Sequence, residues 1–211
     1  MEDDTHELIQ LLLKKFNQKR LYLVGESWGT VLGFKMAEKY PELLNAYMAF
    51  SPVVHQSKSE QILLEKLKLD AKEKGLIQAE QELNTVKIPF SNYEQLYYSR
   101  KWMFKYDGQA IADKDTIALK QYLKVWSGTW SSTWNEAIQQ NLFVELPKID
   151  CPVYFFIGEK DFQTNFKIAK DYFKALQAPK KNIFIFENAG HSVLTEESER
   201  VQKIIIEEIL K

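Results

Sequence analysis

The stretch LYLVGESWGT, residues 21–30, is the feature that most restricts the fold of this chain. Its first four residues form a short apolar run typical of a buried strand, and apolar side chains at helical spacing continue after Gly29 until Pro41. Between these two patterns, Gly25-Glu26-Ser27-Trp28-Gly29 matches the motif G-x-S-x-G. A strand, a tight turn and a helix in this order predict a turn that presents a serine hydroxyl at the end of a strand.

The alternation of strand and helix recurs on both sides of a long central segment. Helices are expected over residues 4–18, 28–40, 166–176 and 197–210, and strands over residues 21–24, 46–50, 153–157 and 183–186. This pattern predicts an α/β fold, with a mostly parallel sheet of about four strands flanked by helices. In such a sheet, functional side chains gather beyond the carboxyl ends of the strands.

The central segment has helical periodicity and lacks strong strand patterns. It holds four of the chain's five tryptophans, at positions 102, 126, 130 and 134. We expect an α/β core made of residues 1–54 and 147–211, and a helical lid or cap over residues 55–146 that covers the carboxyl edge of the sheet. The aromatic side chains fit either the packed core of this lid or an aromatic wall for an apolar or proline-like substrate group.

Composition excludes several classes of function. The chain has 28 Lys and Arg against 29 Asp and Glu, so we expect neither nucleic acid nor an anionic membrane as a partner. The acidic start MEDDTHELIQ and the absence of a run of about 18 apolar residues predict a soluble, cytoplasmic protein. The single cysteine, Cys151, is expected to be a packed thiol. No group of side chains has metal-ligand spacing, so no metal or cofactor is expected.

Two further side chains with acid–base chemistry follow predicted strands. Asp161 lies in FFIGEKDF after the third strand, and His191 lies in ENAGHS after the fourth. A serine nucleophile needs a base, and an imidazole base needs an orienting carboxylate. We therefore expect Ser27, Asp161 and His191 to meet at one edge of the sheet, in the chain order of α/β-hydrolases. Taken singly, Asp161 also fits a helix cap near Thr164, and His191 an ordinary loop residue.

Several segments resemble the lidded α/β-hydrolases similar to proline iminopeptidases. These segments are LYLVGESWGT, AEKYPE, LEKLKLDAKEKG, YYSRKWMFKYDG, CPVYFFIGEKDFQTN and KDYFKALQAPKKNIFIFENAGHSVLTEE, and together they cover most of the chain. The resemblance implies Ser27 as nucleophile, Asp161 as acid and His191 as base. The N–H of Trp28, directly after the nucleophile, is the expected oxyanion-hole donor. Asn165 departs from the family pattern, which often has proline after the acid.

The resemblance also implies more chain before the first strand than the 20 residues found here. Family members carry further strands and a glycine-rich loop that donates a second oxyanion N–H, whereas this sequence has no glycine before Gly25. We therefore expect the carboxyl-terminal part of a lidded hydrolase. Loss of one donor lowers the rate by about 10²- to 10³-fold. The free edge of the first strand predicts self-association into a homo-oligomer.

These observations predict a serine hydrolase with an acyl-enzyme mechanism. The expected substrate is a small peptide or amide with a free N-terminus, and the alternative within the same fold is an ester or thioester. A different alternative is a catalytically silent module that binds partners through the open edge. In iminopeptidases, lid carboxylates hold the substrate's amine; Glu94 and Glu136 lie near the aromatic stretches, but no motif assigns this role to either.

Overall fold

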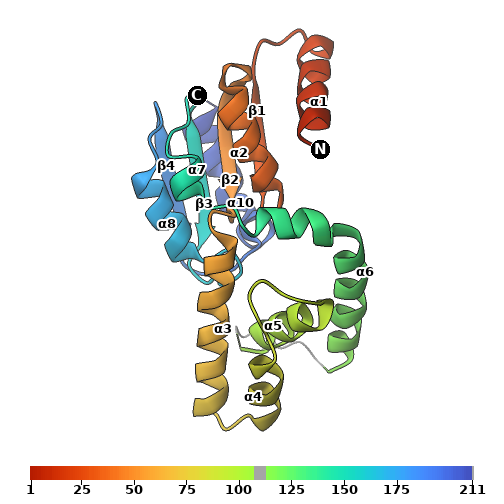
Figure 1. Ribbon diagram of the computed structural model, residues 1–211. Coiled ribbons are helices and arrows are strands. Elements are labelled where there is room, and N and C mark those ends of the chain that lie inside the picture. Colours follow the sequence, from red (N-terminus) through yellow and green to blue (C-terminus); the bar gives the residue numbers. More distant parts are fainter. Residues whose placement is uncertain (107–112, 211) are drawn as a thin grey trace. The chain divides into compact units, whose positions relative to one another are not determined.

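A computed structural model describes residues 1–106 and 113–210, and it divides the chain into two compact units. Unit 1 consists of Met1–His55 and Asn141–Lys211, and unit 2 consists of Gln56–Gln140. Unit 2 is thus an insertion in the chain of unit 1 (Figure 1). Asp107 and Gly108, which end one of the segments that resemble the hydrolase family, lie outside the described residues.

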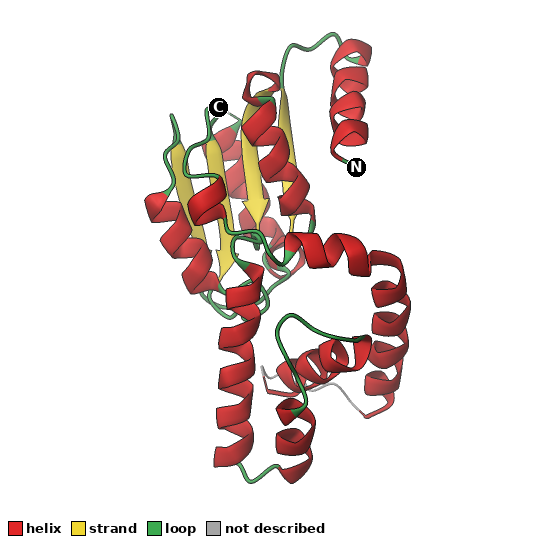
Figure 2. Cartoon of the chain, viewed as in Figure 1, coloured by secondary structure: helices red, strands yellow, loops and turns green. Residues whose placement is uncertain are grey.

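Within the described residues, unit 1 holds a four-stranded parallel sheet in the order β1-β2-β3-β4. The strands are β1 (Leu21–Glu26), β2 (Leu44–Phe50), β3 (Val153–Gly158) and β4 (Lys181–Phe186). The predicted fold class, a mostly parallel sheet flanked by helices, is confirmed. The strands run in the same direction, as the arrowheads in Figure 2 show, so their carboxyl ends share one edge.

Helices cover both faces of this sheet. The helical elements of unit 1 are α1 (Glu2–Lys15), α2 (Gly29–Lys39), the 3₁₀ turn η1 (Pro41–Leu43), α7 (Leu142–Glu145), α8 (Phe166–Ala175), α9 (Val193–Glu196), α10 (Ser198–Ile204) and the π-helical turn η2 (Ile205–Ile209). Side chains of α2, α7 and α8 share one buried cluster with the sheet, and those of α9, α10 and η2 share another. The sheet of unit 1 is therefore covered by packed side chains on both faces.

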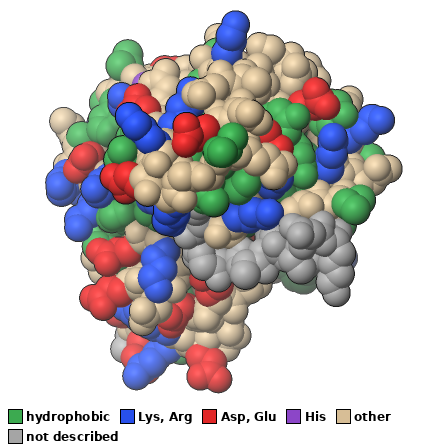
Figure 3. Space-filling view, turned by 90° about the horizontal axis from the view of Figure 1, so that it is seen from below, with side chains coloured by type: hydrophobic (Ala, Val, Ile, Leu, Met, Phe, Trp, Pro, Cys, Tyr) green, Lys and Arg blue, Asp and Glu red, His purple; other side chains and the backbone are tan. Residues whose placement is uncertain are grey.

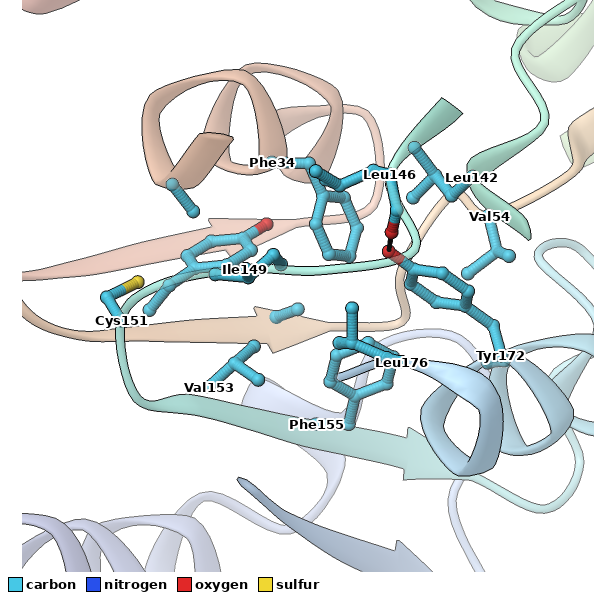
Figure 4. Packing of buried hydrophobic residues seen from close by; sticks show 14 of the residues in the cluster. Phe34, Val54, Leu142, Leu146, Ile149, Cys151, Val153, Phe155, Tyr172 and Leu176 are labelled. Carbon is cyan, nitrogen blue, oxygen red and sulfur yellow. Dashed lines mark hydrogen bonds between the residues drawn. The ribbon is translucent and has the colours of Figure 1, made fainter. Parts of the chain in front are cut away.

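The first of these clusters is aromatic at its centre (Figure 4). Phe34 of α2 meets Tyr172 of α8 edge-on, with ring centroids 6.0 Å apart, and the Tyr172 hydroxyl donates a hydrogen bond to the Leu146 carbonyl at 2.7 Å. Leu142 and Leu146 belong to this cluster, so residues 141–146, which the sequence patterns assigned to the insertion, lie in unit 1. Cys151 is buried here as expected, and burial raises the pKa of its thiol to about 11.

Helix α1 and strand β1 expose apolar side chains. In α1, Ile9 and Leu13 are buried against α2, whereas the helically spaced set Leu8, Leu11, Leu12 and Phe16 is exposed. On β1, Tyr22 and Val24 are 39% and 48% exposed. Within the described residues, β1 is hydrogen-bonded to a strand on one side, β2. Self-association through β1 stays a prediction.

The regular elements described in unit 2 are all helices: α3 (Gln56–Glu73), α4 (Ile77–Asn84), α5 (Tyr93–Tyr106) and α6 (Asp113–Ala137). Leu96, Tyr97 and Leu123 form a buried cluster that joins α5 to α6. Acidic and basic side chains are interspersed on the surface drawn in Figure 3, in keeping with the balanced charge of the sequence. Across residues 1–106 and 113–210, every helix is too short or too polar to span a lipid bilayer.

A buried ion pair ties α3 to α5 inside unit 2. Glu60 is fully buried and Arg100 is 6% exposed. Arg100 Nη1 donates to Glu60 Oε2 at 2.8 Å, Arg100 Nη2 donates to the other carboxylate oxygen, and Gln56 Nε2 donates to that oxygen at 2.8 Å. The planar fork of the guanidinium matches the carboxylate, and the further amide bond helps to offset the cost of burying both charges.

We predict that Arg100→Met lowers the free energy of unfolding of unit 2 by about 3–5 kcal/mol, because it leaves the buried Glu60 carboxylate without its cation. Chemical denaturation followed by tryptophan fluorescence measures this, since four of the five tryptophans lie in unit 2. The control is Lys72→Met, the same type of change at an exposed position of α3, which should alter stability by less than about 0.5 kcal/mol. Equal effects of the two variants would contradict a stabilising role for the pair.

Candidate active site

Ser27 follows β1 in a strained backbone conformation. Its φ is +50°, in the left-handed region that costs a residue with a side chain about 1–3 kcal/mol. The Ser27 N–H donates to the Phe50 carbonyl at 2.9 Å, and the Ser27 carbonyl accepts from the Thr30 N–H at 2.9 Å and from Thr30 Oγ1 at 2.6 Å. Thr30 Oγ1 in turn accepts from the Val53 N–H at 2.9 Å. These bonds tie the strained turn to the end of β2 and to the segment after it.

The two glycines of the G-x-S-x-G motif have different roles. A Cβ added at Gly25 would lie 2.8 Å from the Gly29 carbonyl oxygen, so a larger residue at this position would push the turn open. A Cβ added at Gly29 would meet nothing within 4 Å. The tight turn therefore requires a glycine at position 25 but has room for a side chain at position 29.

Asp161 lies after β3 and is 2% exposed. Its Oδ1 accepts from the backbone N–H groups of Gln163 and Thr164 at 2.9 and 3.0 Å. Its Oδ2 accepts from Thr164 Oγ1 at 2.7 Å and lies 2.9 Å from His191 Nδ1. One oxygen therefore stabilises the turn near Thr164 while the other faces the imidazole, and the cap of the following helix α8 is Asn165 rather than Asp161.

The carboxyl of Asp161 remains ionised over a wide range of pH. Burial by itself raises its pKa, but the charge and the hydrogen bond of His191 and the two hydrogen bonds from Thr164 outweigh burial. The pKa of Asp161 consequently lies below its ordinary value. An ionised carboxylate can only accept hydrogen bonds, so the proton of this contact lies on His191 Nδ1.

His191 lies after β4 and joins the other two side chains. Its Nε2 is 2.7 Å from Ser27 Oγ, and its Nδ1 is 2.9 Å from Asp161 Oδ2. With the proton on Nδ1, a neutral imidazole has Nε2 free to accept from the serine hydroxyl. The structure thus brings together the three side chains predicted from the sequence, each from the loop after a different strand of unit 1.

Two other residues considered in the sequence have clear local roles. Trp28 directly precedes α2, so its N–H lies at a helix N-terminus, where the helix dipole favours negative charge. Asn165 has a φ of +41°, which proline cannot adopt, and its side chain accepts from the N–H groups of Lys167 and Ile168 at the start of α8. Where the family often has proline, this chain therefore has an asparagine that caps helix α8, directly after the loop that carries Asp161.

Two residues near His191 were missed by the sequence analysis. Ser51, after β2, donates from Oγ to the His191 carbonyl at 2.6 Å. Glu196 accepts from the N–H groups of Gly190 and Ser192 at 2.7 and 3.1 Å. The only available signals were that Ser51 follows a predicted strand and that Glu196 follows His191 closely in the chain.

The carboxylates considered as amine ligands lie in unit 2. Glu94 is 3.9 Å from Lys120 in an ion pair that is about half exposed, and Glu136 is also exposed. Among residues 1–106 and 113–210, no group of three or more His, Cys, Asp or Glu side chains is arranged to hold a metal ion.

The chain belongs to the α/β-hydrolase fold family, whose model matches residues 2–198. It is similar to the probable aminopeptidase YbaC of Bacillus subtilis (strain 168), with 23% identity over 92% of this chain, and it spans 66% of that protein's length. Among solved structures, it resembles a proline iminopeptidase from Mycobacterium smegmatis, with 14% identity, a TM-score of 0.60, and coverage of 97% of this chain and 68% of that one. It also resembles an esterase from Exiguobacterium antarcticum, with 16% identity, a TM-score of 0.61, and coverage of 100% and 73%. These structures share the fold.

We predict that Asp161→Asn destabilises the protein in a pH-dependent way. Because the folded-state pKa of Asp161 is lowered, its stabilisation is fully present above the ordinary pKa of about 3.9 and is lost as pH falls through the lower folded-state value. The variant should therefore be less stable than the parent at pH 7, and the difference should shrink below about pH 4. Urea denaturation over this range measures the difference.

The control for this series is Asp171→Asn, which removes an exposed carboxylate that is paired with Lys174. Its effect should be small at every pH, because exposed ion pairs contribute little. A stability difference for Asp161→Asn that does not change between pH 7 and pH 3 would contradict the assignment of an ionised, stabilising carboxylate.

Proposed function

We propose that this protein is a serine hydrolase that acts through an acyl-enzyme intermediate. The observation that carries the proposal is the hydrogen-bonded series from Ser27 Oγ to His191 Nε2 at 2.7 Å and from His191 Nδ1 to Asp161 Oδ2 at 2.9 Å. Nucleophile, base and orienting carboxylate within this reach are the requirements of acyl transfer. Membership of the α/β-hydrolase fold family supports the same reading.

In this mechanism, Ser27 Oγ attacks the substrate's carbonyl carbon while its proton passes to His191 Nε2. Asp161 holds the imidazole in the required tautomer and stabilises the imidazolium that forms. The Trp28 N–H stabilises the oxyanion of the tetrahedral intermediate. His191 then protonates the leaving group, and a water molecule activated by His191 releases the acyl group from Ser27.

The proposed substrate is a small peptide or amide with a free N-terminus. The similarity to a probable aminopeptidase and the likeness to a proline iminopeptidase favour this class, and the likeness to an esterase favours a small ester as the second candidate. We propose unit 2 as the lid that selects the substrate, since it is inserted in the chain after the carboxyl end of β2 and is rich in aromatic side chains.

We predict that a fluorophosphonate probe labels the folded protein at Ser27. Labelling should be lost in Ser27→Ala, and it should be slower by about 10²- to 10⁴-fold in His191→Ala, because the base is then missing. Ser198→Ala, at an exposed serine of α10, should label like the parent. Mass spectrometry of the modified peptide measures the site. Absence of labelling in the folded parent would reject the enzyme and favour a catalytically silent module.

We further predict that a prolyl anilide is turned over with a higher kcat/KM than a short acyl ester. Amide bonds are less reactive than esters, so a preference for the anilide requires a site that positions an amine-bearing substrate. Initial rates for both substrates, each corrected for the Ser27→Ala background, measure the ratio. A higher kcat/KM for the ester than for the anilide would contradict the proposal of an aminopeptidase and support an esterase.

A further inference from the structure

The position of His191 depends on the loop that carries it. The loop connects β4 to α9 and contains Gly190, His191 and Ser192. The bonds to Ser27 and Asp161 orient the imidazole, but the ring lies several ångströms from the backbone, so a small rotation of residue 191 would move Nε2 away from Ser27. An error of about 1 Å in such a contact lowers a reaction rate about 10²-fold. The loop backbone therefore has to be held independently of the ring.

A single carboxylate holds the backbone on both sides of His191. Glu196 Oε2 accepts from the Gly190 N–H at 2.7 Å, and Glu196 Oε1 accepts from the Ser192 N–H at 3.1 Å. Glu196 is the last residue of α9, and its own N–H donates to the Ser192 carbonyl at 2.9 Å. The Glu196 carboxylate thus binds the backbone N–H groups of the residues directly before and directly after His191.

Ser51 fastens the same loop to the sheet. Its Oγ donates to the carbonyl of His191 itself at 2.6 Å, across 140 positions of the chain. Ser51 is 1% exposed, its N–H donates to the Phe156 carbonyl at 2.9 Å, and its φ is +45°. Ser51 is therefore buried, held in a strained conformation and hydrogen-bonded to β3. From this fixed position its hydroxyl binds the loop that follows β4.

The end of β3 supplies a third restraint. A Cβ added at Gly158 would lie 2.1 Å from the Gly190 carbonyl oxygen and 2.4 Å from that of Ala189, so the loop backbone lies directly against this glycine. The Lys160 N–H donates to the Ala189 carbonyl at 3.0 Å. The loop that carries His191 is therefore packed against the loop that carries Asp161.

We infer that Glu196 and Ser51 are positioning residues for His191, which hold its backbone so that the imidazole reaches Ser27. This inference rests on the proposed function. Glu196 is exposed, so its loss should change global stability little, whereas its effect on the Ser27–His191 contact should be large. A residue with a purely structural role would show the opposite pattern.

The test compares the rate of fluorophosphonate labelling at Ser27 among variants that remain folded by circular dichroism. Glu196→Ala should label about 10- to 100-fold more slowly than the parent, with nearly the same melting temperature. Glu196→Gln keeps one acceptor oxygen and should lie between the two. Glu199→Ala, which removes an exposed carboxylate of α10, should label at the parent rate. In a His191→Ala background, Glu196→Ala should cause no further loss, because it acts through the imidazole.

Ser51 is tested by a matched pair of variants. Ser51→Ala and Ser51→Gly both remove the hydroxyl, but glycine relieves the strain of the positive φ. If the hydrogen bond to His191 is what matters, both should slow labelling to a similar extent. A normal rate in Ser51→Gly, with a slow rate in Ser51→Ala, would show that only the backbone conformation matters and would overturn the role of the hydroxyl.

A measurement without any reaction separates this inference from the proposed function. The ¹⁵N and ¹H NMR signals of the His191 ring, including the Nδ1–H that faces Asp161, should shift or broaden in Glu196→Ala and Ser51→Ala and stay unchanged in Glu199→Ala. If the parent does not react with the probe, the hydrolase proposal fails while these spectra still decide the positioning role. Unmoved His191 signals in both variants would overturn the inference, whether or not Ser27 reacts.

Discussion

The parallel alignment of the strands is the constraint on which the rest of this structure depends. Because the strands run in one direction, the loop after each strand emerges at the same edge of the sheet. Each strand delivers one side chain to this edge: Ser27 follows β1, Ser51 follows β2, Asp161 follows β3 and His191 follows β4. Ser27 and His191 are 164 positions apart, yet their polar atoms are within 2.7 Å. An antiparallel sheet would send alternate loops to the opposite edge.

Backbone strain is concentrated at this edge. Ser27, Ser51 and Asn165 have φ values of +50°, +45° and +41°, a conformation that costs about 1–3 kcal/mol for each residue with a side chain. Each is held by hydrogen bonds that a relaxed loop would lose: Ser27 by Thr30, Ser51 by Phe156 and His191, and Asn165 through its cap of α8. These hydrogen bonds, some within one loop and some between loops, help to offset the cost of the strained conformations.

The proposed reacting groups and the proposed substrate-selecting lid lie in different units of the chain. The proposed chemical groups all lie in unit 1, whose sheet has a buried cluster on each face, while four of the five tryptophans lie in unit 2. Two solved structures that are named for different substrates, a proline iminopeptidase and an esterase, resemble this chain with TM-scores of 0.60 and 0.61. The fold alone therefore does not select a substrate, and selection has to come from particular side chains.

The amino-acid sequence by itself determined the order of the four strands and the long helical segment between β2 and β3, and it placed Ser27, Asp161 and His191 in the segments that follow three different strands. These features are local: apolar periodicity, turn residues and the place of a polar residue after a strand can be read within about ten positions. The sequence pattern did not reveal which side of α1 is buried, because Leu8 and Leu11 fit helical spacing as well as Ile9 and Leu13 do. Only the tertiary structure showed that Ser51 and Glu196 hold the His191 loop and that Asn165 caps α8 at a positive φ. For Ser51 the physical reason is that its partner lies 140 positions away, so the bond depends on how the sheet brings two loops together. The bonds of Glu196 and Asn165 join nearby residues, but they depend on backbone conformations that the apolar pattern does not specify.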